Sequence, residues 1–164
     1  MAVDVRQGLP DHVPGIKRVA RRAWYAAHAP IIGPGTVEDF LAEHYDEASL
    51  ESAIRDEDAI LDVAVDDSGT VVGFVSATPT DEVATFALNR VYVHPDRWGE
   101  GVGRSLLTEV ERAIDESGGD RIRLAVMAEN DRAVAFYEAA GYDLIEEFYD
   151  DRIETRSYRY AKDL

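Results

Sequence analysis

The sequence predicts one α/β domain, built as a mixed sheet flanked by helices. Its 164 residues suit a single compact domain. Hydrophobic residues make up 46 % of the chain, which is enough for a substantial core. Strand-like and helix-like stretches alternate, with no repeat, linker or low-complexity segment between them. We therefore expect a single domain over residues 1–164.

The expected elements follow from the spacing of apolar residues and from the turn residues between them. Glycine and proline at 30–35 predict a loop. Strands are expected where apolar residues alternate or cluster, at 2–7, 59–65, 70–77, 83–93, 121–127, 142–145 and 152–160. Helices are expected where apolar residues recur at helical spacing, at 10–28, 37–44, 48–55, 102–117 and 130–140.

In the long strand over 83–93, the apolar residues change from one face of the strand to the other part-way along. Phe86 and Leu88 share one face, whereas Val91 and Val93 fall on the other. One extra residue in the strand would return all four side chains to the same face. We therefore expect a β-bulge near Asn89–Arg90.

Composition excludes several kinds of chemistry. The chain has no cysteine, so disulfides, thiolate metal sites and a cysteine nucleophile are ruled out. Its four histidines show no close metal-ligand spacing, and we expect no metal. There is no apolar run of about 18 residues and no basic-then-apolar N-terminal segment, so we expect a soluble cytoplasmic protein without a membrane partner.

The net charge of −16 bears on the partners of this chain. A negative field repels phosphate backbones, so nucleic acid is not an expected partner. The same field would steer cationic substrates, to an extent that salt screens. Lysine occurs only at Lys17 and Lys162, against 33 acidic residues. This pattern is typical of the acidic, hydrated surface of proteins from salt-loving organisms, and we favour that interpretation over substrate steering.

A glycine-rich segment joins the long strand to the following helix. Gly99, Gly101 and Gly103 let backbone amides approach a ligand closely, at the positive end of a helix dipole. This arrangement predicts a pyrophosphate cradle, to which Arg97 or Arg104 could add a charge-assisted contact. A glycine-rich turn without a ligand is the alternative.

Two common nucleotide motifs do not fit this segment. A Walker loop needs Gly-Lys-Ser/Thr, but Gly103 is followed by Arg104-Ser105. A dinucleotide fingerprint needs Gly-x-Gly-x-x-Gly, but Leu106 stands at the third glycine position.

Residues 97–103 instead resemble the acetyl-CoA signature of the GNAT N-acetyltransferase superfamily, Arg/Gln-x-x-Gly-x-Gly/Ala. Gly101 and Gly103 match, whereas Trp98 stands at the Arg/Gln position. A second stretch resembles the family pattern Asn-x-x-Ala-x-x-Phe-Tyr-x-x-x-Gly-Phe/Tyr. The residues in register with it are Asn130, Ala133, Phe136, Tyr137, Gly141 and Tyr142.

The resemblance implies a mostly antiparallel central sheet with a splayed parallel strand pair at the cofactor site. It also implies acetyl-CoA as cosubstrate and the loop as its main contact. Asn130 has an alternative role as a helix N-cap. The residues expected to bind the cofactor are Val91, Tyr92, Val93, Arg97, Trp98, Gly99, Glu100, Gly101, Val102, Gly103, Arg104, Asn130, Ala133 and Tyr137.

Catalysis is expected to centre on Tyr137. A phenol with a pKa of about 10 can protonate the departing CoA thiolate, whose thiol has a pKa of about 8.5. Core packing is the alternative role of this tyrosine. Family members often place a carboxylate base on the long strand, and Glu82 at its start is the candidate taken here. Glu129, His28, Tyr25 or a water relay remain open as the base.

The acceptor is expected to lie near the end of the first helix, where the resemblance places Trp24, Tyr25 and His28 around the substrate. Core and loop packing is the alternative role of these residues. The expected function is direct transfer of an acetyl group to a primary amine of a small molecule, a peptide or a protein. A non-catalytic acyl-CoA-binding module of the same fold is the rival. The oligomeric state stays open, with a homodimer among the expectations.

Overall fold

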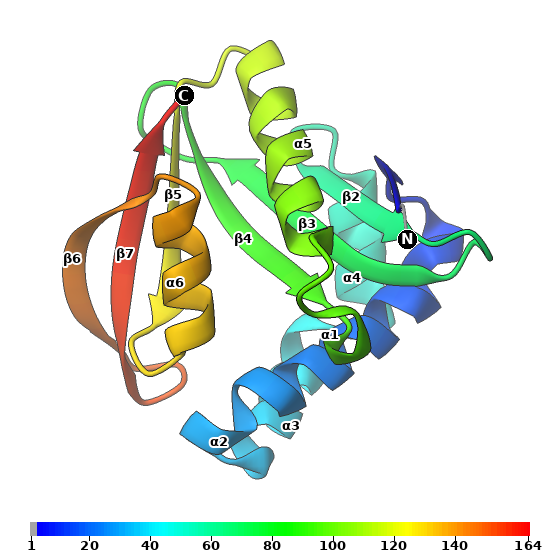
Figure 1. Ribbon diagram of the computed structural model, residues 1–164, viewed down its shortest axis with the longest axis horizontal. Coiled ribbons are helices and arrows are strands. Elements are labelled where there is room, and N and C mark those ends of the chain that lie inside the picture. Colours follow the sequence, from blue (N-terminus) through cyan, green and yellow to red (C-terminus); the bar gives the residue numbers. More distant parts are fainter. Residues whose placement is uncertain (1–2) are drawn as a thin grey trace.

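The computed structural model describes residues 3–164 of the chain. Its strands form one sheet in the order β1-β2-β3-β4-β5-β7-β6, and all neighbours are antiparallel except the parallel pair β4 and β5 (Figure 1). The strands are β1 (Asp4–Gln7), β2 (Ile60–Val65), β3 (Val71–Pro79), β4 (Thr85–Val93), β5 (Arg121–Met127), β6 (Asp143–Asp150) and β7 (Thr155–Asp163).

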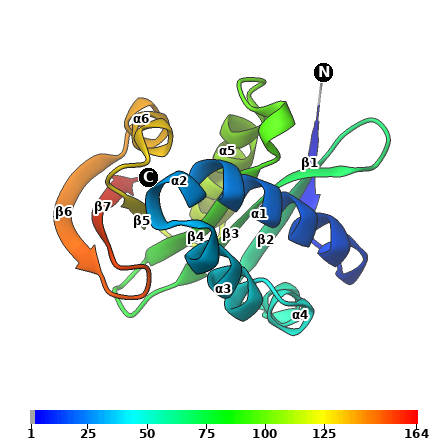
Figure 2. The same cartoon turned by 90° about the horizontal axis from the view of Figure 1, so that it is seen from below.

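Helices cover both faces of the sheet. Figure 2 shows α1 to α4 on one side of it, and α5 and α6 on the other. The α-helices are α1 (Val13–Ala27), α2 (Ala29–Ile32), α3 (Pro34–His44), α4 (Glu47–Arg55), α5 (Val102–Glu116) and α6 (Asp131–Ala139), with 3₁₀ turns η1 (Pro10–His12) and η2 (Pro95–Arg97).

Each face of the sheet has its own hydrophobic core. Alternate residues of β3 belong to different cores, with Phe74 facing α1 and Val75 facing α5. Ile16 and Leu106, from those two helices, have no exposed surface. Burial of side chains of this size stabilises the fold by about 1.5–3 kcal/mol each. The two cores therefore fix the sheet between two helical layers.

The bulge expected in the long strand is confirmed by its register with β3. Ser76 lies opposite Arg90 and Ala77 lies opposite Leu88, so Asn89 is the extra residue. As a consequence, residues 86, 88, 91 and 93 all pack against the α5 core, while Tyr92 packs against the α1 core.

The parallel pair β4 and β5 is short. Residues 85–87 pair with residues 121–123, and beyond them the two strands diverge (Figure 1). The mostly antiparallel sheet with a splayed parallel pair is therefore confirmed. The backbone edge of residues 88–93 that faces β5 is left without a strand partner.

Three expected boundaries are corrected. Stretch 30–35 is not a loop, because α2 and α3 occupy most of it. Pro30 and Pro34 stand in first turns, where proline loses no hydrogen bond, and Gly33 at φ 87° separates the helices.

The strands expected at 142–145 and 152–160 are β6 and β7. β6 is longer because it is an edge strand exposed on both faces, and so lacks apolar alternation. The first strand begins at Asp4, and residue 2 lies outside the described residues.

No helix within residues 3–164 is both long enough and apolar enough to cross a membrane.

Candidate active site

A cleft of about 810 Å³ opens where β4 and β5 separate. Two ends can be distinguished by their linings. The loop end consists of residues 97–104 and the start of α6. The aromatic end consists of residues from α1, α3, β4 and Tyr45, with the β6–β7 connection beside it. One continuous cavity therefore joins the glycine loop to the aromatic side chains.

The loop end has the geometry of an anion cradle. Gly99 and Gly101 have φ values of 81° and 85°, in the left-handed region that favours glycine. Gly101 is the N-cap of α5, and its carbonyl accepts from the amide of Ser105 at 3.0 Å. The amides of residues 102–104 precede that bond, so they lack acceptors within the helix. These donors and the helix dipole favour an anionic ligand.

Trp98 fastens this loop to β4. Its indole Nε1 donates to the carbonyl oxygen of Val93 at 2.8 Å. The guanidinium of Arg132, from α6, lies over the indole ring at 4.3 Å. The Trp98 side chain therefore connects the loop to β4 and α6 within the protein.

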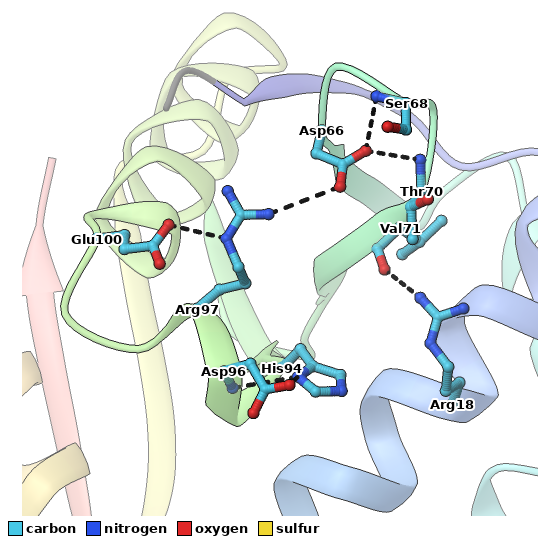
Figure 3. Close-up of polar contacts among 9 residues, drawn as sticks. All are labelled: Arg18, Asp66, Ser68, Thr70, Val71, His94, Asp96, Arg97 and Glu100. Atoms are coloured by element: carbon cyan, nitrogen blue, oxygen red, sulfur yellow. Dashed lines mark hydrogen bonds and ion pairs between the residues drawn. The ribbon is translucent and has the colours of Figure 1, made fainter.

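Arg97 also holds the loop in place, between Glu100 and Asp66, as Figure 3 shows. Its Nε donates to Glu100 Oε1 at 2.8 Å, and its Nη1 lies 3.7 Å from Asp66 Oδ2. Asp66 in turn accepts from the amides of Ser68 and Thr70 in the β2–β3 turn. The charge of Arg97 is thus compensated by carboxylates on both sides, and it ties the loop to that turn.

The start of α6 adds further cleft residues. Asn130 caps the helix, with its Oδ1 accepting from the amide of Ala133 at 3.2 Å, and it also lines the cleft. Tyr137 lies two turns further along and lines the same cavity. Burial raises the pKa of the Tyr137 phenol well above its ordinary value, so it is protonated at neutral pH.

Aromatic rings form the other end of the cleft. Trp24 stacks on Phe40 with centroids 4.4 Å apart, and the His28 ring meets the indole edge-on at the same distance. Tyr45 and Tyr92 pack against this group. Burial lowers the pKa of His28 to about 4, so its imidazole is neutral at pH 7. Within residues 3–164, Trp24 Nε1 and His28 Nδ1 have no hydrogen-bond partner.

Comparison with known proteins decides the family. The sequence matches the model of the Acetyltransferase (GNAT) family over residues 21–142. This chain belongs to the GNAT family. It is therefore an acetyltransferase of the same class as its named relatives.

Individual relatives of this GNAT enzyme cover it to different extents. A spermidine N(1)-acetyltransferase from Thermoplasma acidophilum is 26 % identical over 162 residues, which cover 96 % of this chain and 99 % of that protein. A mycothiol acetyltransferase from Propionibacterium freudenreichii subsp. shermanii is 40 % identical over 86 residues, 51 % of this chain and 27 % of that protein. The crystal structure of PaiA N-acetyltransferase from T. acidophilum, in complex with coenzyme A, superposes with a TM-score of 0.90 over 100 % of both chains, at 23 % identity.

Most residues that the GNAT resemblance marked lie together in the cleft. Glu100 lies outside the lining and faces Arg97. The others expected around the cofactor all line it: Val91, Tyr92, Val93, Arg97, Trp98, Gly99, Gly101, Val102, Gly103, Arg104, Asn130, Ala133 and Tyr137.

Two further expected residues, Tyr25 and Glu82, lie outside the cleft lining. The Tyr25 hydroxyl donates to Glu38, and Arg21 lies over its ring, so this tyrosine points to the outer face of α1. Glu82 lies at the β3–β4 connection, where it accepts from Arg123 at 3.0 Å and borders a separate small hollow. Their neighbours Trp24 and His28 do line the cleft.

Several lining residues were not predicted from the sequence. Arg90 stands beside the bulge, and Asp150, Arg152, Ile153 and Ser157 come from around the β6–β7 connection. No local motif marks these positions, because tertiary packing brings them to the cavity. Within residues 3–164, no group of three or more His, Asp or Glu side chains is placed to hold a metal ion.

Proposed function

We propose that this GNAT enzyme transfers the acetyl group of acetyl-CoA to a primary amine by direct attack within a ternary complex. The observation that carries the proposal is the single cleft running from the amide cradle at α5 to the aromatic end, with Tyr137 in its lining. One anionic cosubstrate and one amine can meet in such a cavity without a covalent enzyme intermediate, for which the chain has no cysteine.

The loop end fits the phosphates of acetyl-CoA. The free amides of residues 102–104 lie next to Gly99 and Gly101, which have no Cβ. The space where a Cβ would stand at these two glycines is open, with no protein atom within 4 Å. Arg104 and Arg132 line the same end and pair with no carboxylate among residues 3–164. The unpaired backbone edge of β4 would hold the extended arm in the way a neighbouring strand does.

The cosubstrate supplies an activated acyl thioester. The amine nitrogen attacks the acetyl carbon, a C–N bond forms and the C–S bond breaks. Tyr137, protonated at neutral pH, donates a proton or a hydrogen bond to the departing sulfur. The proton that the amine loses passes to water in the open cleft, since the buried His28 imidazole, with a pKa of about 4, is a weak base.

The acceptor remains to be assigned by assay. The relative from T. acidophilum is named for spermidine, so spermidine is the first amine to test.

The experiment measures thiol release from acetyl-CoA with a panel of primary amines. Tyr137→Phe should lower kcat by about 10- to 100-fold while KM for acetyl-CoA changes less than about threefold. Tyr149→Phe is the matched control, because this tyrosine is 59 % exposed on β6. Unchanged turnover in Tyr137→Phe would contradict the proton-donor role.

The rival function, a non-catalytic acyl-CoA-binding module, predicts a different pattern. Acetyl-CoA at 100 times its Kd should stabilise either protein by about 2.7 kcal/mol. Stabilisation without thiol release from any amine would favour the binding module.

A further inference from the structure

The cleft has the opposite charge from the rest of the molecule. The chain carries a net charge of −16, yet seven arginines line this cavity and Asp150 is the one acidic residue in its described lining. Focusing of field lines in a cleft makes its local charges more important to a ligand than the distant surface. The lining therefore favours anionic groups, whereas a surface of this charge alone would favour cations.

Four of these arginines are compensated by carboxylates. Arg97 has its two acidic partners, and Arg123, Arg152 and Arg159 pair with Glu82, Asp150 and Glu146 at 2.9–3.2 Å. Arg90, Arg104 and Arg132 remain, with no carboxylate within 4 Å in the described chain. Arg104 and Arg132 lie at the loop end, where the phosphates of acetyl-CoA require positive charge.

Arg90 lies at the aromatic end, away from that loop. The bulge at Asn89 sets Arg90 on the sheet face that carries Tyr92. Its guanidinium lies over the Tyr45 ring at 5.3 Å, and its Nη1 donates to Ser76 Oγ at 3.1 Å. Both neighbours are neutral and buried, so the positive charge of Arg90 is oriented but not compensated.

The groups around Arg90 are mainly hydrogen-bond donors. Trp24 packs against Tyr45, and its buried indole nitrogen can only donate. Burial raises the pKa of the neighbouring Tyr45 hydroxyl, which therefore keeps its proton. A polycation placed here would face the positive charge of Arg90, and the lining offers no unpaired carboxylate to bind it. A carboxylate would provide acceptors for the uncompensated guanidinium of Arg90.

We propose that the acceptor is an amine that also carries a carboxylate, an amino-acid-like molecule, and that Arg90 binds the carboxylate. This inference rests on the proposed function and names its substrate class. The carboxylate of such a molecule would neutralise Arg90, and its amine end would extend along the cleft toward Tyr137. The acceptor thus differs in charge from the spermidine for which the T. acidophilum relative is named.

The test compares acceptors that differ only in charge. The substrates are ω-amino acids from glycine to 5-aminopentanoate, each beside its neutral carboxamide, with spermidine as the polycation. In the wild type, the best carboxylate should exceed its amide in kcat/KM by at least about tenfold. Arg90→Gln should reduce that ratio to near one. The rate with the amide should change less than about threefold, and so reports that the variant is folded.

Arg112→Gln is the control, because it removes the same charge from the outer face of α5, where Arg112 pairs with Glu109 and Glu116. It should keep the wild-type ratio. Three results would overturn the inference and leave the proposed function standing: equal rates with carboxylate and amide, a preference for spermidine, or a ratio that survives Arg90→Gln. No thiol release with any of these amines would overturn the proposed function and the inference with it.

Discussion

The indole nitrogen of Trp98 donates a 2.8 Å hydrogen bond to the carbonyl oxygen of Val93, five residues earlier in the chain. This bond closes the segment between the end of β4 and the start of the glycine loop. Arg132 stacks on the other part of the same side chain, so Trp98 also joins the loop to α6. A position that carries Arg or Gln in the family signature is here an internal support of the cradle.

Trp98→Phe should weaken cofactor binding more than chemistry. The variant keeps a ring for Arg132 but leaves the Val93 carbonyl without its donor. We expect a loss of about 1 kcal/mol in the free energy of unfolding. We also expect a three- to tenfold rise in KM for acetyl-CoA, with kcat within about twofold, because only the placement of the amides changes. Denaturant unfolding and steady-state kinetics measure both. A Trp98→Arg variant that binds acetyl-CoA more tightly than the wild type would contradict the supporting role.

Gly101 and Gly103 should respond differently to alanine. Gly101 has φ 85°, so Gly101→Ala forces a side chain into the left-handed region at a cost of about 1 kcal/mol. A Cβ at Gly103 would meet Phe136 at 3.5 Å, an ordinary van der Waals contact in a helical backbone. Thermal unfolding of both variants should show a lower Tm for Gly101→Ala and a nearly unchanged Tm for Gly103→Ala. Equal losses would show that the backbone conformation of Gly101 does not set the cost.

The contact between Asp66 and Arg97 should affect the cofactor at a distance. Asp66→Asn keeps an oxygen for the amides of the β2–β3 turn but removes the charge that faces the guanidinium. Both side chains are under 20 % exposed, so we expect a loss of about 1 kcal/mol in stability and a higher KM for acetyl-CoA. Glu116→Gln removes one charge from an exposed pair on α5 and serves as control, with an expected change near zero. Identical kinetics in both variants would contradict the coupling of turn and loop.

Local motifs could group the residues at the loop end of the cleft, because these residues lie close together in the sequence. The glycine loop leads directly into α5, and Asn130 and Tyr137 lie on one short helix. The change of face of the apolar residues around Asn89 likewise predicted a bulge that the strand register contains. In each case, neighbouring residues were enough to specify the local geometry.

The aromatic end depends on packing between distant segments, which no local pattern encodes. Helical periodicity separates Trp24 from Tyr25, since Trp24 lies on the buried stripe with Ile16 and Ala20. Tyr25 lies off that stripe, and its hydroxyl contacts Glu38. The uncompensated charge of Arg90 could not be predicted at all, because it depends on where every carboxylate lies in the folded chain. Glu82 shows the same limit, since its partner Arg123 is 41 residues away.

The buried imidazole of His28 should make stability depend on pH in a defined window. Its pKa is about 4 in the folded protein, against an ordinary value of 6.5. As the pH falls below 6.5, the His28 imidazole therefore binds a proton in the unfolded chain but stays neutral in the folded protein. Stability is lost progressively between pH 6.5 and 4, and no contribution from this group changes above that range. The lowered pKa corresponds to a loss of about 3 kcal/mol across the window.

His28→Phe removes this titration and keeps an aromatic ring beside Trp24 and Tyr92. The variant should therefore lose less stability than the wild type between pH 7 and pH 4, by roughly 2–3 kcal/mol. Phe40→Leu is the control, because it changes the packing beside Trp24 without removing a titratable group, and it should keep the wild-type slope. Urea unfolding of the three proteins at several pH values measures the difference. Parallel curves for the wild type and His28→Phe would show that burial of the imidazole does not oppose its protonation.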